Sequence, residues 1–173
     1  MRSLLRHILL SATILLAALL GTGCHELDDE RIPAMAVNIN MDNAGVWAVF
    51  GVKGFGDSKR FILTSKERVP SDFPYTSTSA TGYGGVLLIW GQNPFSGEVG
   101  PMAFDLSCPV ERMPEIRVHI GENFEAICDH CGSHYNVVEQ YGRPIEGPAK
   151  RDNYAMTPYQ CYATINGGYL IGR

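Results

Sequence analysis

Positive charge is scarce in this sequence. Its 14 Lys and Arg residues are outnumbered by 18 Asp and Glu residues, which gives a formal net charge of −4 at pH 7. A nucleic-acid-binding surface needs a basic face, so we expect no nucleic-acid partner. Repeats and low-complexity segments are also missing, whereas 45% of the residues are apolar. This composition is typical of a single globular domain with a core of its own.

Two further absences narrow the class of protein. Nowhere after residue 32 do apolar residues recur at the three- and four-residue spacing of an amphipathic helix, which argues against a helical bundle. The sequence also lacks the G-x-S-x-G, phosphate-loop and H-E-x-x-H motifs of common enzyme sites. We therefore expect a protein that does not turn over a substrate itself.

Short apolar runs, many of them alternating with polar residues, take the place of helical patterns. They cover residues 37–41, 46–50, 60–63, 85–90, 102–106, 116–120, 124–127, 135–138, 159–165 and 169–171. About ten short strands at roughly 8–12-residue spacing predict an all-β sandwich or barrel. Residues 85–90 are apolar throughout, which is typical of a strand covered on both faces. Residues 65–81 are polar and interrupted by Pro, so they predict a long loop with a helical turn.

The first residues have the parts of an export signal. Arg2 and Arg6 precede a thirteen-residue, predominantly apolar stretch over residues 8–20, which is shorter than the ~20 residues of a membrane-spanning helix. Small residues then lead directly to Cys24. This arrangement resembles the lipobox of bacterial lipoproteins. An ordinary signal peptide or an uncleaved anchor is the alternative interpretation.

The lipobox resemblance implies a domain organisation and a location. Residues 1–23 would be a lipoprotein signal peptide, and Cys24 would carry the lipid that holds the protein to the membrane. Residues 24–31 are rich in charge and predict a tether, and residues 32–173 predict one domain. The expected location is the bacterial cell envelope, facing the periplasm or the surface.

Four more cysteines follow in the domain. Cys128 and Cys131 form a C-x-x-C motif, and Cys108 lies twenty positions upstream; each segment comes directly after a predicted strand. Two loops that bring thiolates to one point are typical of a metal site, although an oxidising compartment also permits a disulfide. Cys161 lies within a predicted strand and is expected to be a buried, inert thiol.

The segment from Cys108 to the end of the chain resembles the Rieske-like iron–sulfur domain family. That family has C-x-H, then 15 to 17 residues, then C-x-x-H-G-S-x-[FY], and later G-x-P-x-x-G-P-A. The matching stretches here are CPV at 108–110, CDHCGSHY at 128–135 and GRPIEGPA at 142–149. The resemblance implies a Rieske-like β-fold with a cluster-type subdomain over residues 108–149. It also implies that the Gly147-Pro148-Ala149 segment covers the site, that the Ser133 hydroxyl hydrogen-bonds a cluster sulfur, and that Tyr135 packs beneath the second loop.

The ligand positions depart from the family pattern. A Rieske [2Fe–2S] centre uses two Cys and two His, but Val110 and Cys131 stand where the two histidines would be. Three alternatives remain. The thiols of Cys108, Cys128 and Cys131 hold a [2Fe–2S] cluster with an irregular fourth ligand, they hold zinc, or two of them form a disulfide. The fourth-ligand candidates are His130, His134 and Glu111.

Two functions correspond to these alternatives. A loaded cluster would make the protein an electron carrier for an unidentified redox partner, whereas zinc or a disulfide would make it a non-redox structural or binding lipoprotein. In either metal case the three sulfur atoms should converge to within about 4 Å of one another. Because no regular fourth ligand is present, we expect a bound metal to be lost readily in air while the fold persists.

Overall fold

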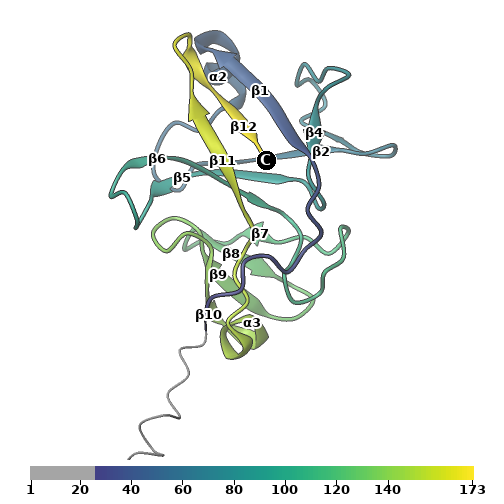
Figure 1. Ribbon diagram of the computed structural model, residues 1–173, viewed down its shortest axis with the longest axis vertical. Helices are drawn as coiled ribbons and strands as arrows, with labels where there is room; N and C mark the ends of the chain where they lie inside the picture. Colours follow the sequence, from purple (N-terminus) through teal and green to yellow (C-terminus); the bar gives the residue numbers. More distant parts are fainter. Residues whose placement is uncertain (1–25) are drawn as a thin grey trace, which may run out of the picture.

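The computed structural model describes residues 26–173, so the expected signal peptide and Cys24 lie outside the described residues. These residues form two antiparallel sheets with two short helices, which confirms the all-β prediction (Figure 1). The curled large sheet has the order β3-β2-β5-β6-β11-β12-β1-β4, and the small sheet has the order β10-β9-β8-β7. No helix within residues 26–173 is both long and apolar enough to cross a membrane.

The strands of the large sheet come from both ends of the described chain. They are β1 (Val37–Asn43), β2 (Ser58–Leu63), β3 (Arg68–Val69), β4 (Ala80–Thr81), β5 (Val86–Gln92), β6 (Val99–Asp105), β11 (Pro158–Ala163) and β12 (Gly167–Gly172). The small sheet and its helix lie between β6 and β11 in the sequence. They comprise β7 (His119–Ile120), β8 (Glu125–Cys128), β9 (Ser133–Asn136), β10 (Arg143–Glu146) and α3 (Gly147–Asp152).

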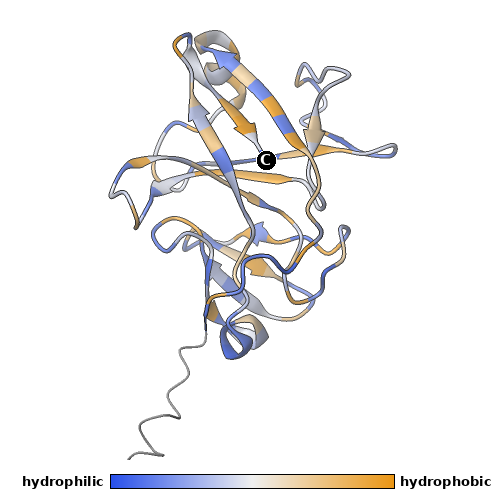
Figure 2. Cartoon of the chain, viewed as in Figure 1, coloured by the Kyte–Doolittle hydropathy of each residue, from blue (hydrophilic) through white to orange (hydrophobic). Residues whose placement is uncertain are grey.

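Strand β5 lies between two hydrophobic clusters. Leu87 and Ile89 belong to the cluster that also contains Tyr135 of the small sheet, whereas Val86 and Leu88 belong to the cluster enclosed by the large sheet. Successive side chains of a strand point to opposite faces, so an uninterrupted apolar run serves both clusters. The prediction that residues 85–90 are covered on both faces is confirmed, and much of β5 has the hydrophobic colour in Figure 2.

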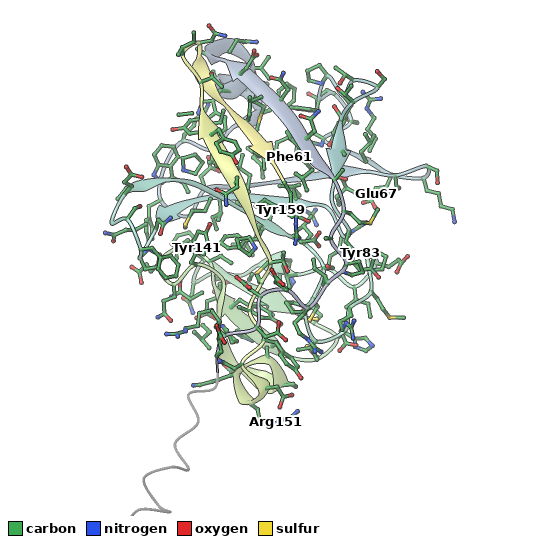
Figure 3. The ribbon with its side chains drawn as sticks, viewed as in Figure 1. Phe61, Glu67, Tyr83, Tyr141, Arg151 and Tyr159 are labelled. Atoms are coloured by element: carbon green, nitrogen blue, oxygen red, sulfur yellow. The ribbon has the colours of Figure 1, made fainter. Side chains whose placement is uncertain are left out.

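Asp105 ties several segments together where the two sheets meet. Its carboxylate is fully buried at the end of β6. Figure 3 shows Tyr159, one of its partners, in the middle of the molecule. The carboxylate accepts hydrogen bonds from the backbone N–H groups of Tyr83, Gly84 and Ser107 and from the hydroxyls of Ser107 and Tyr159. A buried carboxylate is tolerated because donors surround it.

The strand predicted at residues 46–50 is wrong, because these residues belong to helix α2 (Ala44–Phe50). The Asn43 side chain accepts a hydrogen bond from the Val46 backbone N–H at 2.9 Å and so caps the helix. The Gly51 N–H closes its other end on the Trp47 carbonyl. A short apolar run is compatible with either a strand or a helix. Here the Asn43 cap favours the helix.

The segment at residues 65–81 also differs from expectation. The secondary structure within it consists of two-residue strands and no helical turn. Strand β3 pairs with β2, and β4 pairs with β1. The loop is therefore fastened to both edges of the large sheet by backbone pairing that its polar sequence did not reveal.

The described part of the expected tether packs against the domain. The Asp28 N–H donates to the Asn153 carbonyl at 3.0 Å, and the Ala155 N–H donates back to the Asp28 carbonyl at 2.8 Å. The Arg31 guanidinium lies 3.8 Å from the centre of the Tyr154 ring. Backbone pairing uses no side chain, so charged residues can dock while their side chains remain in water.

Candidate metal centre

Two loops of the small subdomain present the candidate thiols. Cys108 follows β6, and its backbone N–H donates to the Ile116 carbonyl, which closes the first loop. Cys128 ends β8, and the Gly132 N–H donates to the Cys128 carbonyl across the C-x-x-C turn. Gly132 has φ +68°, a left-handed conformation that glycine adopts without strain. The turn thus brings Cys131 back beside the end of β8.

The three sulfur atoms converge as the spacing predicted. The Sγ atoms of Cys108, Cys128 and Cys131 all lie within 4.8 Å of one another, and the Cys108–Cys131 distance is 3.6 Å. Ligands about 2.3 Å from one tetrahedral metal ion would stand roughly 3.8 Å apart. Cys108 and Cys128 are buried and Cys131 is partly exposed. These three cysteines could therefore hold a metal ion.

Hydroxyl groups surround two of the thiols. The Cys131 Sγ atom donates to the Ser133 Oγ atom at 3.2 Å, and the Cys108 Sγ atom lies 3.5 Å from the Tyr135 hydroxyl. Both hydroxyl-bearing residues are fully buried on β9. Such neighbours fix the orientation of metal-ligating side chains and stabilise negative charge on sulfur.

The Gly147-Pro148-Ala149 segment lies against this second loop. The Ala149 N–H donates to the Ser133 Oγ atom at 3.1 Å, so α3 begins directly beside the hydroxyl that contacts Cys131. A Cβ atom on Gly147 would stand 2.4 Å from the Gly132 carbonyl oxygen. Glycine is required there by the close approach of the two backbones as well as by its φ of +74°.

Burial keeps the metal-free thiols of Cys108 and Cys128 protonated. Desolvation raises the pKa of Cys108 above its ordinary value and raises that of Cys128 to about 12. The pKa of the Tyr135 hydroxyl is also raised, first by burial and then by the neighbouring Cys108 thiol. A cation placed among these sulfurs would reverse the preference, since it compensates the charge of the thiolates.

The two histidines offered as fourth ligands do not join the cysteine group. The His130 Nδ1 atom lies 2.9 Å from Glu111 Oε1, and the His134 Nδ1 atom lies 2.9 Å from Glu125 Oε2. Neither histidine, nor Glu111, places a ligand atom within the 4.8 Å cluster. Each imidazole is thus held by a carboxylate to one side of the thiols.

The described residues do not provide the ligand set of a standard Rieske cluster. Val110, at the first histidine position, packs against the hydrophobic core. Cys131 occupies the second position, and its sulfur lies 3.6 Å from the Cys108 sulfur. A two-iron centre divides four ligands between two irons, whereas these three thiols surround one point.

Cys161 lies apart from the cluster. It is half-buried on β11 rather than fully buried, and it lines a different cavity from the three converging cysteines. Burial raises its pKa to about 12, so its thiol is neutral and weakly reactive at physiological pH. The expected inertness has this physical basis, and the cavity itself had no signal in the sequence.

Comparison with known proteins identifies no relative. No family model matches the sequence, and neither the curated proteins nor the solved structures contain a match. Function is therefore inferred from the geometry of the cysteine site and from the sequence patterns themselves.

Proposed function

We propose that this protein is a metal-binding module of the bacterial cell envelope in which Cys108, Cys128 and Cys131 hold one metal ion. The observation that carries the proposal is the mutual approach of the three sulfur atoms to within 4.8 Å. Three thiolates suit a thiophilic divalent ion such as zinc. They would neutralise the ion and leave one excess negative charge, which the hydroxyls of Ser133 and Tyr135 are placed to stabilise.

The scaffold we propose for this ion is a Rieske-like domain whose ligand set has changed. The contact between Ala149 and Ser133 supports this, because it joins the G-P-A segment to the C-x-x-C loop as the resemblance implies. The fourth coordination position would then be left to a solvent molecule or another exogenous ligand. The protein would bind metal without turning over a substrate.

A [2Fe–2S] electron carrier is the second candidate. It is favoured by the Ser133 and Tyr135 hydroxyls beside two of the sulfurs, since hydrogen bonds to sulfur tune the reduction potentials of iron–sulfur clusters. It is disfavoured by the absence of any fourth ligand close to the three thiols among residues 26–173. The same thiols could also form a disulfide in an oxidising compartment.

Metal analysis of the full chain purified without oxygen distinguishes these three states. We expect about one zinc per chain, no visible absorption, and loss of the metal when any one of the three cysteines is replaced by alanine. The matched control is Cys161→Ala, which removes a thiol outside the cluster and should keep the metal. Two irons with inorganic sulfide and a visible spectrum would overturn the single-ion proposal, as would a metal-free disulfide.

We also propose that a lipid on Cys24 anchors the protein. The Glu26 carbonyl accepts a hydrogen bond from the Asn153 side chain at 2.9 Å, at the end of α3. A lipid only two residues earlier would therefore hold the α3 end of the small subdomain toward the bilayer, with the large sheet farther away. The cysteine site would then lie in the membrane-proximal half of the protein.

Replacing Cys24 with serine should abolish lipidation, because serine lacks the thiol that receives the lipid. Metabolic labelling with a fatty acid, followed by membrane fractionation, measures the effect. Unfolding of the variant should match that of the natural chain, since the substitution precedes the domain predicted at residues 32–173. Undiminished labelling of the Cys24→Ser variant would rule the anchor out.

A further inference from the structure

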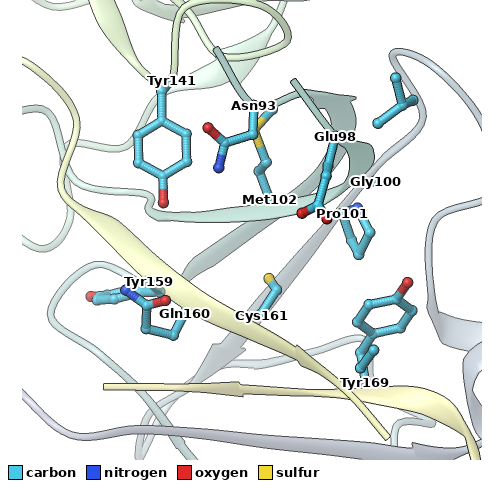
Figure 4. Close-up of a pocket in the computed structure, with 12 residues that line it drawn as sticks. Asn93, Glu98, Gly100, Pro101, Met102, Tyr141, Tyr159, Gln160, Cys161 and Tyr169 are labelled. Atoms are coloured by element: carbon cyan, nitrogen blue, oxygen red, sulfur yellow. The ribbon is translucent and has the colours of Figure 1, made fainter. Parts of the chain in front are cut away.

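A cavity separate from the cysteine cluster opens where strands β6 and β11 part. These strands pair only through Pro158 with Phe104 and Tyr159 with Ala103. Beyond these two pairs, a cavity of about 510 Å³ is lined by residues 99–102 of β6 and by Gln160, Cys161 and Ala163 of β11 (Figure 4). This volume lies within the usual range of small-molecule sites.

A proline in β6 keeps the sheet open at this cavity. Pro101 pairs with Trp90 of β5 on one side and lines the cavity on the other. Proline has no backbone N–H to donate to a further strand, so it is found where a strand has an open edge. The sheet is thereby prevented from closing over the cavity.

Two tyrosine rings stand on opposite sides of this space and are braced from outside. The Tyr141 ring packs edge-on against Phe104 and Phe95, with centroid distances of 5.5 and 5.6 Å. The Tyr169 ring lies 4.4 Å from the Trp47 ring. Figure 4 shows Cys161 between the two tyrosines. The rings are therefore in position before any ligand arrives, which lowers the entropy cost of binding.

The backbone conformation of Tyr141 is a second indication of a preformed binding site. Its φ of 53° is left-handed, a conformation that is rare for a bulky side chain. Such conformations persist where the surrounding structure enforces them, and they are common at ligand-binding positions. Here the result is that the ring lies between its two phenylalanine neighbours and the cavity.

The described residues that line the cavity carry negative charge and no positive charge. Glu98 contributes a carboxylate, and none of the described residues that line the cavity is Lys, Arg or His. The hairpin loop holds Glu98 in place: its carbonyl accepts from the Asn93 N–H at 2.9 Å, and its carboxylate accepts from the Ser96 hydroxyl at 3.4 Å. The Cys161 thiol, kept neutral by burial, adds no charge at physiological pH.

We propose that this cavity binds a small organic cation, an amine or a quaternary ammonium compound, between the Tyr141 and Tyr169 rings and beside Glu98. Aromatic faces attract cations through their quadrupole, and the carboxylate supplies the complementary full charge. Met102 and Pro101 offer apolar surface to the body of such a ligand. The site is independent of the metal centre.

Calorimetric titration of the full chain with choline and benzyltrimethylammonium tests this assignment. We expect saturable binding of the cations and at least about tenfold weaker binding of 3,3-dimethyl-1-butanol, which has the shape of choline without its charge. Glu98→Lys should abolish cation binding while the metal content stays unchanged. Glu122→Lys, at an exposed position in the turn between β7 and β8, is the matched control and should bind normally.

Three results would overturn the proposal. They are no saturable binding of either cation, equal affinity for the uncharged alcohol, and undiminished binding by the Glu98→Lys variant. Because Glu98 lies on the surface, its substitution is not expected to impair folding. Circular dichroism of the variant checks this directly.

Discussion

Replacing Asp105 with alanine should lower the free energy of unfolding by about 4 kcal/mol, because breaking a buried polar network is one of the few mechanisms that cause so large a loss. The carboxylate is fully buried, and its oxygens accept hydrogen bonds at 2.6 to 3.0 Å from donors of Tyr83, Gly84 and Ser107, and a further one from the Tyr159 hydroxyl. Alanine would leave these donors unpaired in the interior, at a cost of about 1–3 kcal/mol for each that water cannot reach.

Urea denaturation monitored by fluorescence measures this loss. Tyr159→Phe removes one of the donors and leaves the carboxylate with its other partners, so it should cost about 1 kcal/mol. Glu122→Ala removes an exposed carboxylate and should change the free energy of unfolding by less than about 0.5 kcal/mol. If Asp105→Ala cost no more than Glu122→Ala, Asp105 would not be holding these segments together.

The affinity of the cysteine site for zinc should rise by at least about a factor of one hundred per pH unit between pH 6 and pH 8. Burial raises the pKa of Cys108 and brings that of Cys128 to about 12, so both thiols carry protons throughout this range. Metal binding displaces at least these two protons, and each proton released makes the apparent affinity about tenfold greater per pH unit. Binding is therefore favoured by rising pH and lost as pH falls.

Competition against a zinc indicator under reducing conditions measures this dependence. Cys128→Ala, which should lose its metal on purification, also removes one of the displaced protons, so zinc added back should bind more weakly and with about tenfold less pH dependence per pH unit. Cys161→Ala should leave it unchanged, since that thiol lines the separate cavity. An affinity that does not vary with pH would mean that these thiols are not ligands.

Local sequence patterns were sufficient to predict most of the large sheet. Alternating residues at 37–41 and the apolar run at 85–90 correspond to β1 and β5, because strand formation depends on which faces are buried. The run at 46–50 was misassigned to a strand, since its pattern is compatible with both structures and the Asn43 cap selected the helix. The two-residue strands β3 and β4 had no pattern, because pairing with β2 and β1 alone defines them.

The candidate site, like the sheet, could be predicted only in part from the sequence. The resemblance to the Rieske-like pattern implied that Cys108 would meet Cys128 and Cys131, and the sulfur atoms do converge. The sequence did not reveal that His130 and His134 would turn to Glu111 and Glu125, because side-chain orientation depends on partners contributed by other segments of the chain. The tertiary structure thus determines which side chains lie close enough to the thiols to act as ligands.

By itself, the sequence determined the all-β class and the long two-faced strand, since both follow from periodicity, and its resemblance to the Rieske-like pattern implied the meeting of three thiols. Only the tertiary structure decided the burial that keeps two of those thiols protonated, the donors around Asp105, and the cavity beside Tyr141 and Glu98. Each of these depends on segments far apart in the chain, and their distances are set by how the two sheets pack rather than by any local pattern.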